Sequence, residues 1–85
     1  MVRWYVYIIE CCDKTLYTGI TTDINRRLSQ HNSGKGGKYT RNRKPVTLKA
    51  LFEFDNRSSA SKEEYRIKQL PKSEKIKLYE GNQKN

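Results

Sequence analysis

The sequence predicts an α+β domain in which a three-stranded antiparallel sheet is flanked by helices, in the order β-β-α-β-α-α. Three segments rich in β-branched and aromatic residues predict the strands, and three segments with helical spacing of apolar residues predict the helices. A chain of 85 residues has room for one small domain. We expect this domain to span residues 1–81, followed by a disordered tail at 82–85.

The first two strands are predicted over residues 4–11 and 15–21, with a turn at 12–14. Such a short connection favours an antiparallel hairpin. Because strand residues alternate between two faces, the hairpin can bring Tyr7 and Tyr17 to the same side of the sheet. That face is either a tyrosine-rich core or a functional surface, and the pattern allows both.

The first helix is predicted to follow the hairpin directly. Thr22 or Asp23 can cap its start, and the helical pattern ends near Asn32. Residues 33–45 then form a predicted loop, which carries three glycines and five positive charges but no negative charge.

The second half of the chain predicts one strand and two helices. The strand covers residues 46–55, and a long helix opens at 56–59 and runs to about Leu70. Proline follows this helix and cannot continue it. A short third helix is predicted over 73–79, ending at Gly81.

The charge balance points to a polyanionic partner. The chain has 18 Lys and Arg against 9 Asp and Glu, a formal charge of +9. Nucleic acid is the first candidate and an acidic membrane surface the second. The longest apolar run, residues 4–9, is far shorter than the roughly 20 residues of a membrane span. The adjacent Cys11 and Cys12 make a poor disulfide, so we expect free thiols and a cytoplasmic location.

Two helices carry polar residues that could serve chemistry. Arg27 and His31 are four residues apart and project from one helix face. On the second long helix, Glu63 and Glu64 lie beside the apolar stripe, where a carboxylate needs a cation or a metal ion. The spacing also allows a structural histidine and ordinary salt bridges.

Two short motifs carry a resemblance to a known family. Tyr-Val-Tyr at 5–7 and Tyr-Thr-Gly at 17–19 resemble the paired motif of the GIY-YIG nuclease superfamily. The run 17–31 and the helical segment 64–68 match the continuation of that pattern. The resemblance covers residues 4–79 and is strongest to small, stand-alone bacterial members that are largely uncharacterised. It implies the same three-stranded antiparallel sheet flanked by helices.

The resemblance also implies an activity. Members of the superfamily are metal-dependent endonucleases, so we expect hydrolysis of DNA phosphodiester bonds with one Mg²⁺ or Mn²⁺ ion, in DNA repair or processing. The expected partner is nucleic acid, with DNA favoured over RNA, and not a membrane. The alternative is a nucleic-acid-binding module that keeps the nuclease fold with little or no catalysis.

The resemblance assigns expected roles residue by residue. Glu64 matches the metal-binding carboxylate, and its neighbour Glu63 is the alternative ligand. Arg27 matches the arginine that stabilises charge on the phosphate. One of two tyrosines is implied to activate the attacking water, and a histidine assists by hydrogen bonding. The candidate catalytic residues are therefore Tyr7, Tyr17, Arg27, His31 and Glu64.

Three details bear on this assignment. A tyrosine base has an ordinary pKa near 10, which nearby cations such as Arg27, Lys14 or the metal ion would have to lower. Gly19 matches a glycine that leaves room near the site. Tyr5 stands where the superfamily motif has glycine, so it is expected to crowd one end of the site.

The basic loop is the predicted grip on substrate. Its cations can neutralise phosphates, and its tyrosine can stack on an unpaired base. A solvated, flexible loop is the alternative. The candidate nucleic-acid-binding residues are Lys35, Lys38, Tyr39, Arg41, Arg43 and Lys44.

Overall fold

The computed structural model describes residues 2–80 and confirms the predicted fold class. The strands are β1 (Trp4–Glu10), β2 (Leu16–Thr21) and β3 (Thr47–Phe54). The helices are α1 (Ile24–Asn32), α2 (Lys38–Arg41), α3 (Arg57–Lys68) and α4 (Lys72–Glu80). The predicted helix end at Gly81 and the predicted tail at 82–85 lie outside the described residues.

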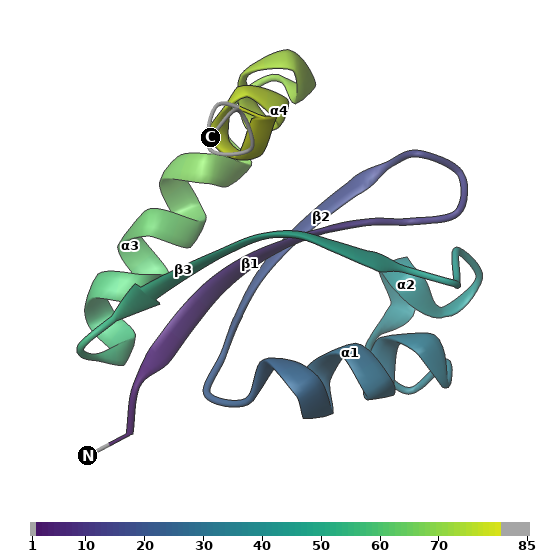
Figure 1. Cartoon of the computed structure of the whole chain (residues 1–85), viewed down its shortest axis with the longest axis horizontal. Coiled ribbons are helices and arrows are strands. Elements are labelled where there is room, and N and C mark those ends of the chain that lie inside the picture. The colour runs from purple at the N-terminus through teal and green to yellow at the C-terminus, as the bar shows by residue number, and fades with distance from the viewer. Residues whose placement is uncertain (1, 81–85) are drawn as a thin grey trace.

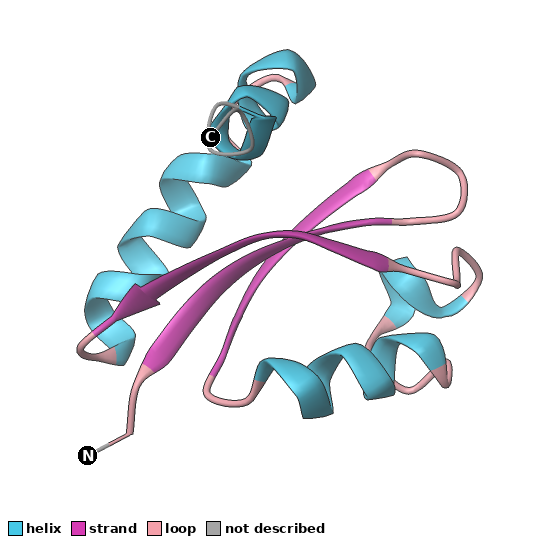
Figure 2. Cartoon of the chain, in the orientation of Figure 1, coloured by secondary structure: helices cyan, strands magenta, loops and turns pink. Residues whose placement is uncertain are grey.

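The three strands form one antiparallel sheet in the order β2-β1-β3, so β1 is central. Figure 1 shows α1 and α2 on one side of the twisted sheet and α3 and α4 on the other. Figure 2 shows that short loops connect most of these elements. The single-turn helix α2 lies inside the segment 33–45, which the sequence predicted as a loop throughout. That prediction was wrong there, because four residues are too few to show helical periodicity.

Short polar side chains begin two of the helices. The Asp23 carboxylate accepts a hydrogen bond from the backbone N–H of Arg26 at 3.1 Å, so Asp23 caps α1. Asn56 accepts one from the backbone N–H of Ser59 at 2.8 Å at the start of α3. Each cap satisfies a donor that the first helical turn leaves unpaired, typically worth about 1 kcal/mol.

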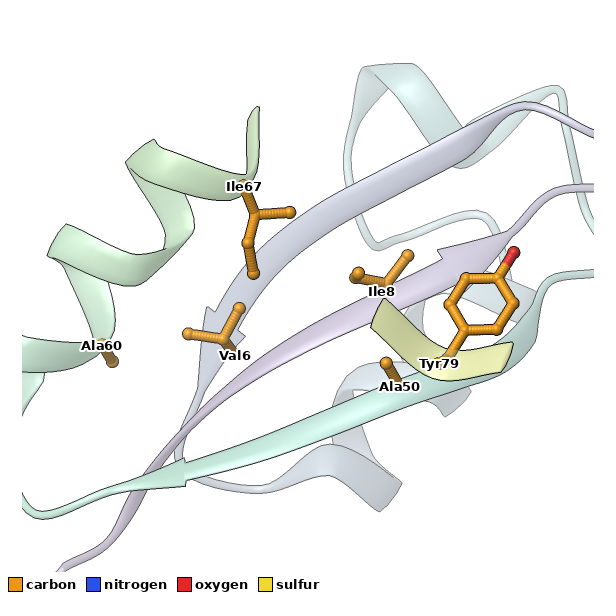
Figure 3. Close-up of a cluster of buried hydrophobic side chains, with 6 residues drawn as sticks. All are labelled: Val6, Ile8, Ala50, Ala60, Ile67 and Tyr79. Atoms are coloured by element: carbon orange, nitrogen blue, oxygen red, sulfur yellow. The ribbon is translucent and has the colours of Figure 1, made fainter. Parts of the chain in front are cut away.

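One face of the sheet packs on α3 and α4. Val6 and Ile8 of β1 are fully buried there, against Ala60 and Ile67 of α3. Full burial of each such aliphatic side chain contributes roughly 1.5–3 kcal/mol to the free energy of unfolding. Figure 3 shows the six buried members of this cluster, Val6, Ile8, Ala50, Ala60, Ile67 and Tyr79.

The opposite face of the sheet packs on α1. Tyr7 and Ile9 of β1 are buried in a second cluster, with Ile24 and Leu28 of α1 packed against it. The alternation predicted for the first strand is therefore confirmed. The central strand supports two separate cores, and the tyrosines belong to the one under α1.

The turn between β1 and β2 links distant parts of the chain. The Asp13 carboxylate accepts a hydrogen bond from Arg43 Nε at 3.1 Å, and Cys12 N–H donates to the Arg43 carbonyl at 2.9 Å. The Lys72 ammonium donates to the Lys14 carbonyl at 2.7 Å. This turn thus fixes the end of the 33–45 segment on one side and the start of α4 on the other.

Two further observations bear on the sequence predictions. Cys11 is buried and Cys12 is exposed, and neither forms a disulfide. No helix within residues 2–80 is long and apolar enough to cross a membrane.

Candidate active site

The two motif tyrosines lie together on the α1 face of the sheet. Tyr7 is opposite Gly19 in the β1–β2 pairing, and Tyr17 is opposite Ile9. The two tyrosine rings are 6.3 Å apart between centroids. The prediction that the hairpin brings both tyrosines to one side is confirmed.

Gly19 makes room for the Tyr7 ring. A Cβ atom at Gly19 would lie 2.5 Å from Tyr7 Oη and 2.7 Å from Tyr7 Cζ. Real Cβ atoms do not approach other atoms so closely, so any larger residue would push the ring away. The close approach expected at this glycine is therefore made by the neighbouring side chain.

Gly19→Ala is expected to destabilise the fold by about 1–3 kcal/mol, because the new methyl group overpacks against a buried ring. Urea unfolding would measure the change. The same substitution in a Tyr7→Phe background is expected to cost less, because the closest atom, the hydroxyl oxygen, is gone. Equal costs in both backgrounds would contradict this explanation.

Helix α1 places Arg27 and His31 against the Tyr7 hydroxyl. Arg27 Nε donates a hydrogen bond to Tyr7 Oη at 3.3 Å, and His31 Nε2 lies 3.1 Å from the same oxygen. The His31 ring is fully buried and meets the Tyr17 ring edge-on, with 5.6 Å between centroids. The expected shared face of Arg27 and His31 is confirmed, and both side chains converge on one hydroxyl.

The segment 33–45 holds this cluster from the other side. Thr40 Oγ1 lies 2.6 Å from His31 Nδ1, and the Gly36 carbonyl accepts a hydrogen bond from Arg27 at 2.8 Å. Gly36 also packs so closely on His31 that a Cβ atom there would be 2.7 Å from the His31 Cα. Gly36 and Thr40 are buried, so the segment is anchored on the cluster at these two residues, while its lysines are exposed.

Arg27 retains hydrogen-bonding capacity after these contacts. A guanidinium has five N–H donors. Three are used, by the Tyr7 hydroxyl, the Gln30 side-chain carbonyl at 3.0 Å and the Gly36 carbonyl. The two remaining N–H groups can be offered to a phosphate, and the three bonds hold the guanidinium plane in place.

Burial decides the protonation of both groups that meet at the Tyr7 hydroxyl. Burial raises the pKa of Tyr7, and the lowering effect of the Arg27 hydrogen bond and charge does not cancel it. Arg27 therefore acts on this pKa in the direction expected of a nearby cation, but in the protein alone burial outweighs its effect. Burial, together with the Arg27 charge, lowers the pKa of His31 below its usual 6.5, so the imidazole is neutral at pH 7.

The lowered pKa of His31 predicts a pH-dependent stability. The unfolded chain binds a proton at His31 more readily than the folded chain does, so stability is full above about pH 6.5 and is lost as the pH falls below it. Each pK unit of difference contributes about 1.4 kcal/mol. Urea unfolding between pH 7.5 and pH 5.5 measures the loss. Because the chain has 1 histidine, His31→Gln should flatten the profile in this range, and an unchanged profile would contradict the assignment.

Glu64 approaches the tyrosines from α3. Its negative charge contributes to the raised pKa of Tyr7, so the carboxylate lies within electrostatic reach of that hydroxyl. Glu64 Oε2 is 3.1 Å from Lys68 Nζ, and the same ammonium lies 5.9 Å from the Tyr17 ring centroid. Glu64 and Lys68 therefore border the tyrosine pair.

Glu63 is engaged elsewhere. Both of its carboxylate oxygens accept hydrogen bonds from Arg66, at 2.8 and 2.6 Å. This bidentate pair lowers the pKa of Glu63. The salt-bridge alternative from the sequence therefore describes both glutamates, and of the two, Glu64 is the one whose charge contributes to the raised pKa of Tyr7.

The donor chemistry fits the metal ion that the resemblance implied. Residues 2–80 contain no group of three or more His, Cys, Asp or Glu side chains that could hold a metal ion. A single partly exposed carboxylate at Glu64 is a hard oxygen donor that leaves most of the coordination shell to water and phosphate. Mg²⁺ favours such sites, and Mn²⁺ accepts the same ligands.

The predicted nucleic-acid-binding residues divide into two groups. Lys35, Lys38, Arg41 and Lys44 are exposed around α2. Arg43 is instead paired with an aspartate, and its guanidinium carbon lies 4.4 Å from the centre of the Tyr39 ring. The Tyr39 ring is also 5.4 Å from the Tyr17 ring and is 39 % exposed. Tyr39 therefore extends the active-site aromatic cluster, and an incoming base can reach only part of its ring.

Tyr5 lies outside the aromatic cluster. It pairs with Thr21 and Glu53 in the sheet, and within residues 2–80 its ring makes no aromatic contact with Tyr7, Tyr17 or His31. Tyr5 lies two residues along β1 from Tyr7, and the expected crowding of that end of the site stays a prediction.

Sequence reasoning missed several residues that complete the site. Thr40 stands between basic residues, a context that gives no sign of burial. Gln30 is one of several polar residues on α1, and its type and position do not distinguish it from the others. The glycines of the segment were the available signal, because glycine often marks a close backbone approach. The missed residues are Gln30, Gly36, Thr40 and Lys68.

Comparison with known proteins identifies similar chains. The family model described as the GIY-YIG catalytic domain matches residues 3–77. A UPF0213 protein of Halobacterium salinarum is 55 % identical over 75 residues, covering 88 % of this chain and 97 % of that protein. A UPF0213 protein of Oceanobacillus iheyensis is 54 % identical over 76 residues, covering 89 % of this chain and 88 % of its own.

Solved structures agree with this likeness. A UPF0213 protein from Bacillus halodurans, solved by solution NMR, matches with a TM-score of 0.58 and 47 % identity, over 89 % of this chain and 81 % of that one. An Enterococcus faecalis protein, also solved by NMR, matches with a TM-score of 0.65 and 38 % identity, over 95 % of this chain and 86 % of its own.

Proposed function

Because this chain belongs to the GIY-YIG catalytic-domain family, we propose that it is an endonuclease that hydrolyses DNA phosphodiester bonds with one Mg²⁺ or Mn²⁺ ion. A nucleic-acid substrate follows from the family, and DNA and the metal ion are part of the proposal. One observation supports it most strongly. Tyr7, Arg27 and His31, from two elements, meet at one hydroxyl, with Tyr17 beside them and Glu64 within electrostatic reach.

Each part of this cluster has a role in phosphodiester hydrolysis. The scissile phosphate is an anion that repels nucleophiles, and charge grows on its oxygens during attack. Arg27 offers two free N–H donors to those oxygens from a position fixed by three other hydrogen bonds. Tyr7 and Tyr17 border the place where the attacking water would stand.

Glu64 would hold the metal ion. When bound, the ion would neutralise charge on the phosphate and polarise it toward attack. Lys68 now pairs with this carboxylate, so its ammonium must turn away, and its 46 % exposed side chain leaves it free to do so. From there Lys68 can contribute its charge to the phosphate backbone.

Binding of DNA should depend on the exposed cations near α2. The double substitution Lys38→Gln/Arg41→Gln is expected to weaken binding and to reduce the slope of log K against log salt by about 1.4–1.8, for two phosphate contacts. Fluorescence anisotropy over a salt series would measure it. The charge-matched control Lys62→Gln/Lys77→Gln removes cations from α3 and α4. Equal slopes for both double variants would exclude the α2 cations as the grip.

The proposal is tested with purified protein and labelled single-stranded, duplex, flapped and branched DNA. Mg²⁺, Mn²⁺ and chelator arms run in parallel, and circular dichroism confirms folding. We expect metal-dependent cleavage of at least one substrate. Salt-sensitive binding without cleavage in any arm would overturn the nuclease proposal in favour of a binding module with the nuclease fold.

A further inference from the structure

Thr40 is a buried residue that the proposed chemistry has not yet used. It is 1 % exposed, and its hydroxyl lies 2.6 Å from Nδ1 of the fully buried His31. On the other side of the same ring, Nε2 lies 3.1 Å from Tyr7 Oη, which receives the Arg27 Nε–H. A continuous chain of hydrogen bonds therefore runs from Arg27 through Tyr7 and His31 to Thr40.

A neutral imidazole has one N–H and one acceptor nitrogen, so this chain has two arrangements. In the first, His31 Nδ1–H donates to Thr40 and the Tyr7 hydroxyl donates to Nε2. In the second, Thr40 donates to Nδ1 and Nε2–H donates to Tyr7 Oη. The arrangements differ in which hydroxyl proton is left without an acceptor.

The first arrangement costs less. In the second, Tyr7 Oη accepts from both Arg27 and His31, and its own proton finds no acceptor within residues 2–80. In the first, the proton left over belongs to Thr40. A phenol is a much stronger acid than an alcohol and hence the better donor, so leaving its proton unpaired costs more.

We propose that Thr40 is a positioning residue that holds His31 as the Nδ1–H tautomer, so that Nε2 accepts the hydrogen bond of the Tyr7 phenol. This inference rests on the proposed function for its catalytic meaning, but the tautomer itself is a property of the protein alone. Helix α2 would therefore position His31 through Thr40 in addition to carrying positive charge.

The consequence for the proposed reaction is a proton relay with a neutral phenol. As water attacks phosphorus, one of its O–H bonds breaks and a new O–H bond forms on Tyr7. The original Tyr7 O–H bond breaks as an N–H bond forms at His31 Nε2, leaving an imidazolium. The bond from phosphorus to the leaving oxygen breaks, and that oxygen takes a proton from solvent. The extra proton on His31 Nε2 then returns to Tyr7 Oη, which releases the proton taken from water, and the starting arrangement is restored. No free phenolate is required.

The charged and titratable groups around His31 come from every element packed on it. Tyr7 and Tyr17 face it from the sheet, and Arg27 lies one turn away on its own helix. From α2 the neighbour is Thr40, which carries no charge. Arg27 opposes protonation of His31, so the relay holds the transferred proton only briefly.

The test reads the tautomer directly by NMR. The chain has 1 histidine, so long-range ¹H–¹⁵N correlation of ¹⁵N-labelled protein at pH 8 gives one unambiguous ring. We expect a protonated Nδ1 in the wild type and in Thr40→Ser, which keeps the hydroxyl. In Thr40→Val the Nδ1–H tautomer leaves a buried N–H without an acceptor, a cost that offsets the cost of an unpaired Tyr7 proton, so the Nε2–H form should become populated. A wild-type Nε2–H tautomer, or an unchanged tautomer in Thr40→Val, would overturn the proposal.

Thr18→Val is the matched control. Thr18 is also a buried threonine, but its hydroxyl has no hydrogen-bond partner within residues 2–80. This variant should keep both the fold and the wild-type tautomer. If Thr40→Val fails to fold, Thr40→Ala and the wild-type tautomer itself still decide the question.

Cleavage kinetics add a separate arm. Thr40→Val is expected to lower kcat at least roughly tenfold with little change in KM, and Thr40→Ser to recover most of it. An inactive wild type with the Nδ1–H tautomer would refute the proposed nuclease and leave the positioning role intact. An active enzyme whose kcat is unaffected by Thr40→Val would refute the catalytic meaning of that role.

Discussion

Glu64→Gln is expected to abolish metal-dependent cleavage, with a loss of at least about a thousandfold in kcat/KM. A metal ion supplies several kcal/mol of charge stabilisation in the transition state, and about 4 kcal/mol corresponds to that factor. The amide keeps the size of the side chain but removes the charge that holds the ion. The affinity for Mn²⁺, measured by electron paramagnetic resonance, should fall as well. A fall in affinity shows that activity is lost because the ion no longer binds, whereas unchanged affinity would mean that a later step is impaired.

The fold should survive this substitution. Glu64 pairs with Lys68 one helical turn away, and a partly exposed pair of this kind contributes only about 0.3–0.5 kcal/mol. Glu63→Gln is the matched control, since it removes a carboxylate from the adjacent position that is bound to Arg66. If Glu63→Gln loses activity and Glu64→Gln retains it, the two glutamates have been assigned the wrong way round.

Arg27→Ala is expected to lower kcat by roughly 10³-fold or more, the lower range for an arginine that stabilises a transferring phosphoryl group. It should also destabilise the fold by about 1.5–4.5 kcal/mol, because the side chain makes three hydrogen bonds, each worth about 0.5–1.5 kcal/mol. Single-turnover kinetics at low temperature, with unfolding curves beside them, would separate the two effects.

Two variants control for the loss of charge. Arg26 is the adjacent residue and is exposed, so Arg26→Ala should change kcat by no more than about twofold. Arg27→Lys keeps the charge but cannot reproduce a planar guanidinium held at three points. It should bind DNA nearly as well as the wild type and cleave poorly. Full activity of Arg27→Lys would show that charge alone is needed.

Much of the fold could be predicted because local patterns and tertiary structure agree. The alternation along β1 places Val6 and Ile8 on one face and Tyr7 and Ile9 on the other. Each pair is buried in a separate hydrophobic cluster, as the alternation predicted. Capping residues marked the start of α1 within one residue. In the candidate site, helical spacing was enough to place Arg27 and His31 together, because both lie on a single element.

The segment 33–45 could not be predicted in the same way, because its structure depends on contacts with distant residues. Thr40 is buried beside His31, 9 residues earlier in the chain, and Arg43 pairs with Asp13, 30 residues earlier. The pKa of Tyr7 also depended on burial, which a list of neighbouring cations does not reveal. The composition of this segment can be read directly, but its role depends on contacts formed only in the folded chain.

The two-sided core offers a practical route for engineering. Helices α3 and α4 cover Val6, Ile8, Ala60 and Ile67 on the face of the sheet away from the Tyr7 hydroxyl. Substitutions at sites without shared contacts usually have additive effects on the free energy of unfolding. Repacking these buried positions, with Glu64 and Lys68 of α3 left unchanged, can therefore raise the free energy of unfolding. Destabilising variants on the α1 side could then be purified and assayed in a folded state.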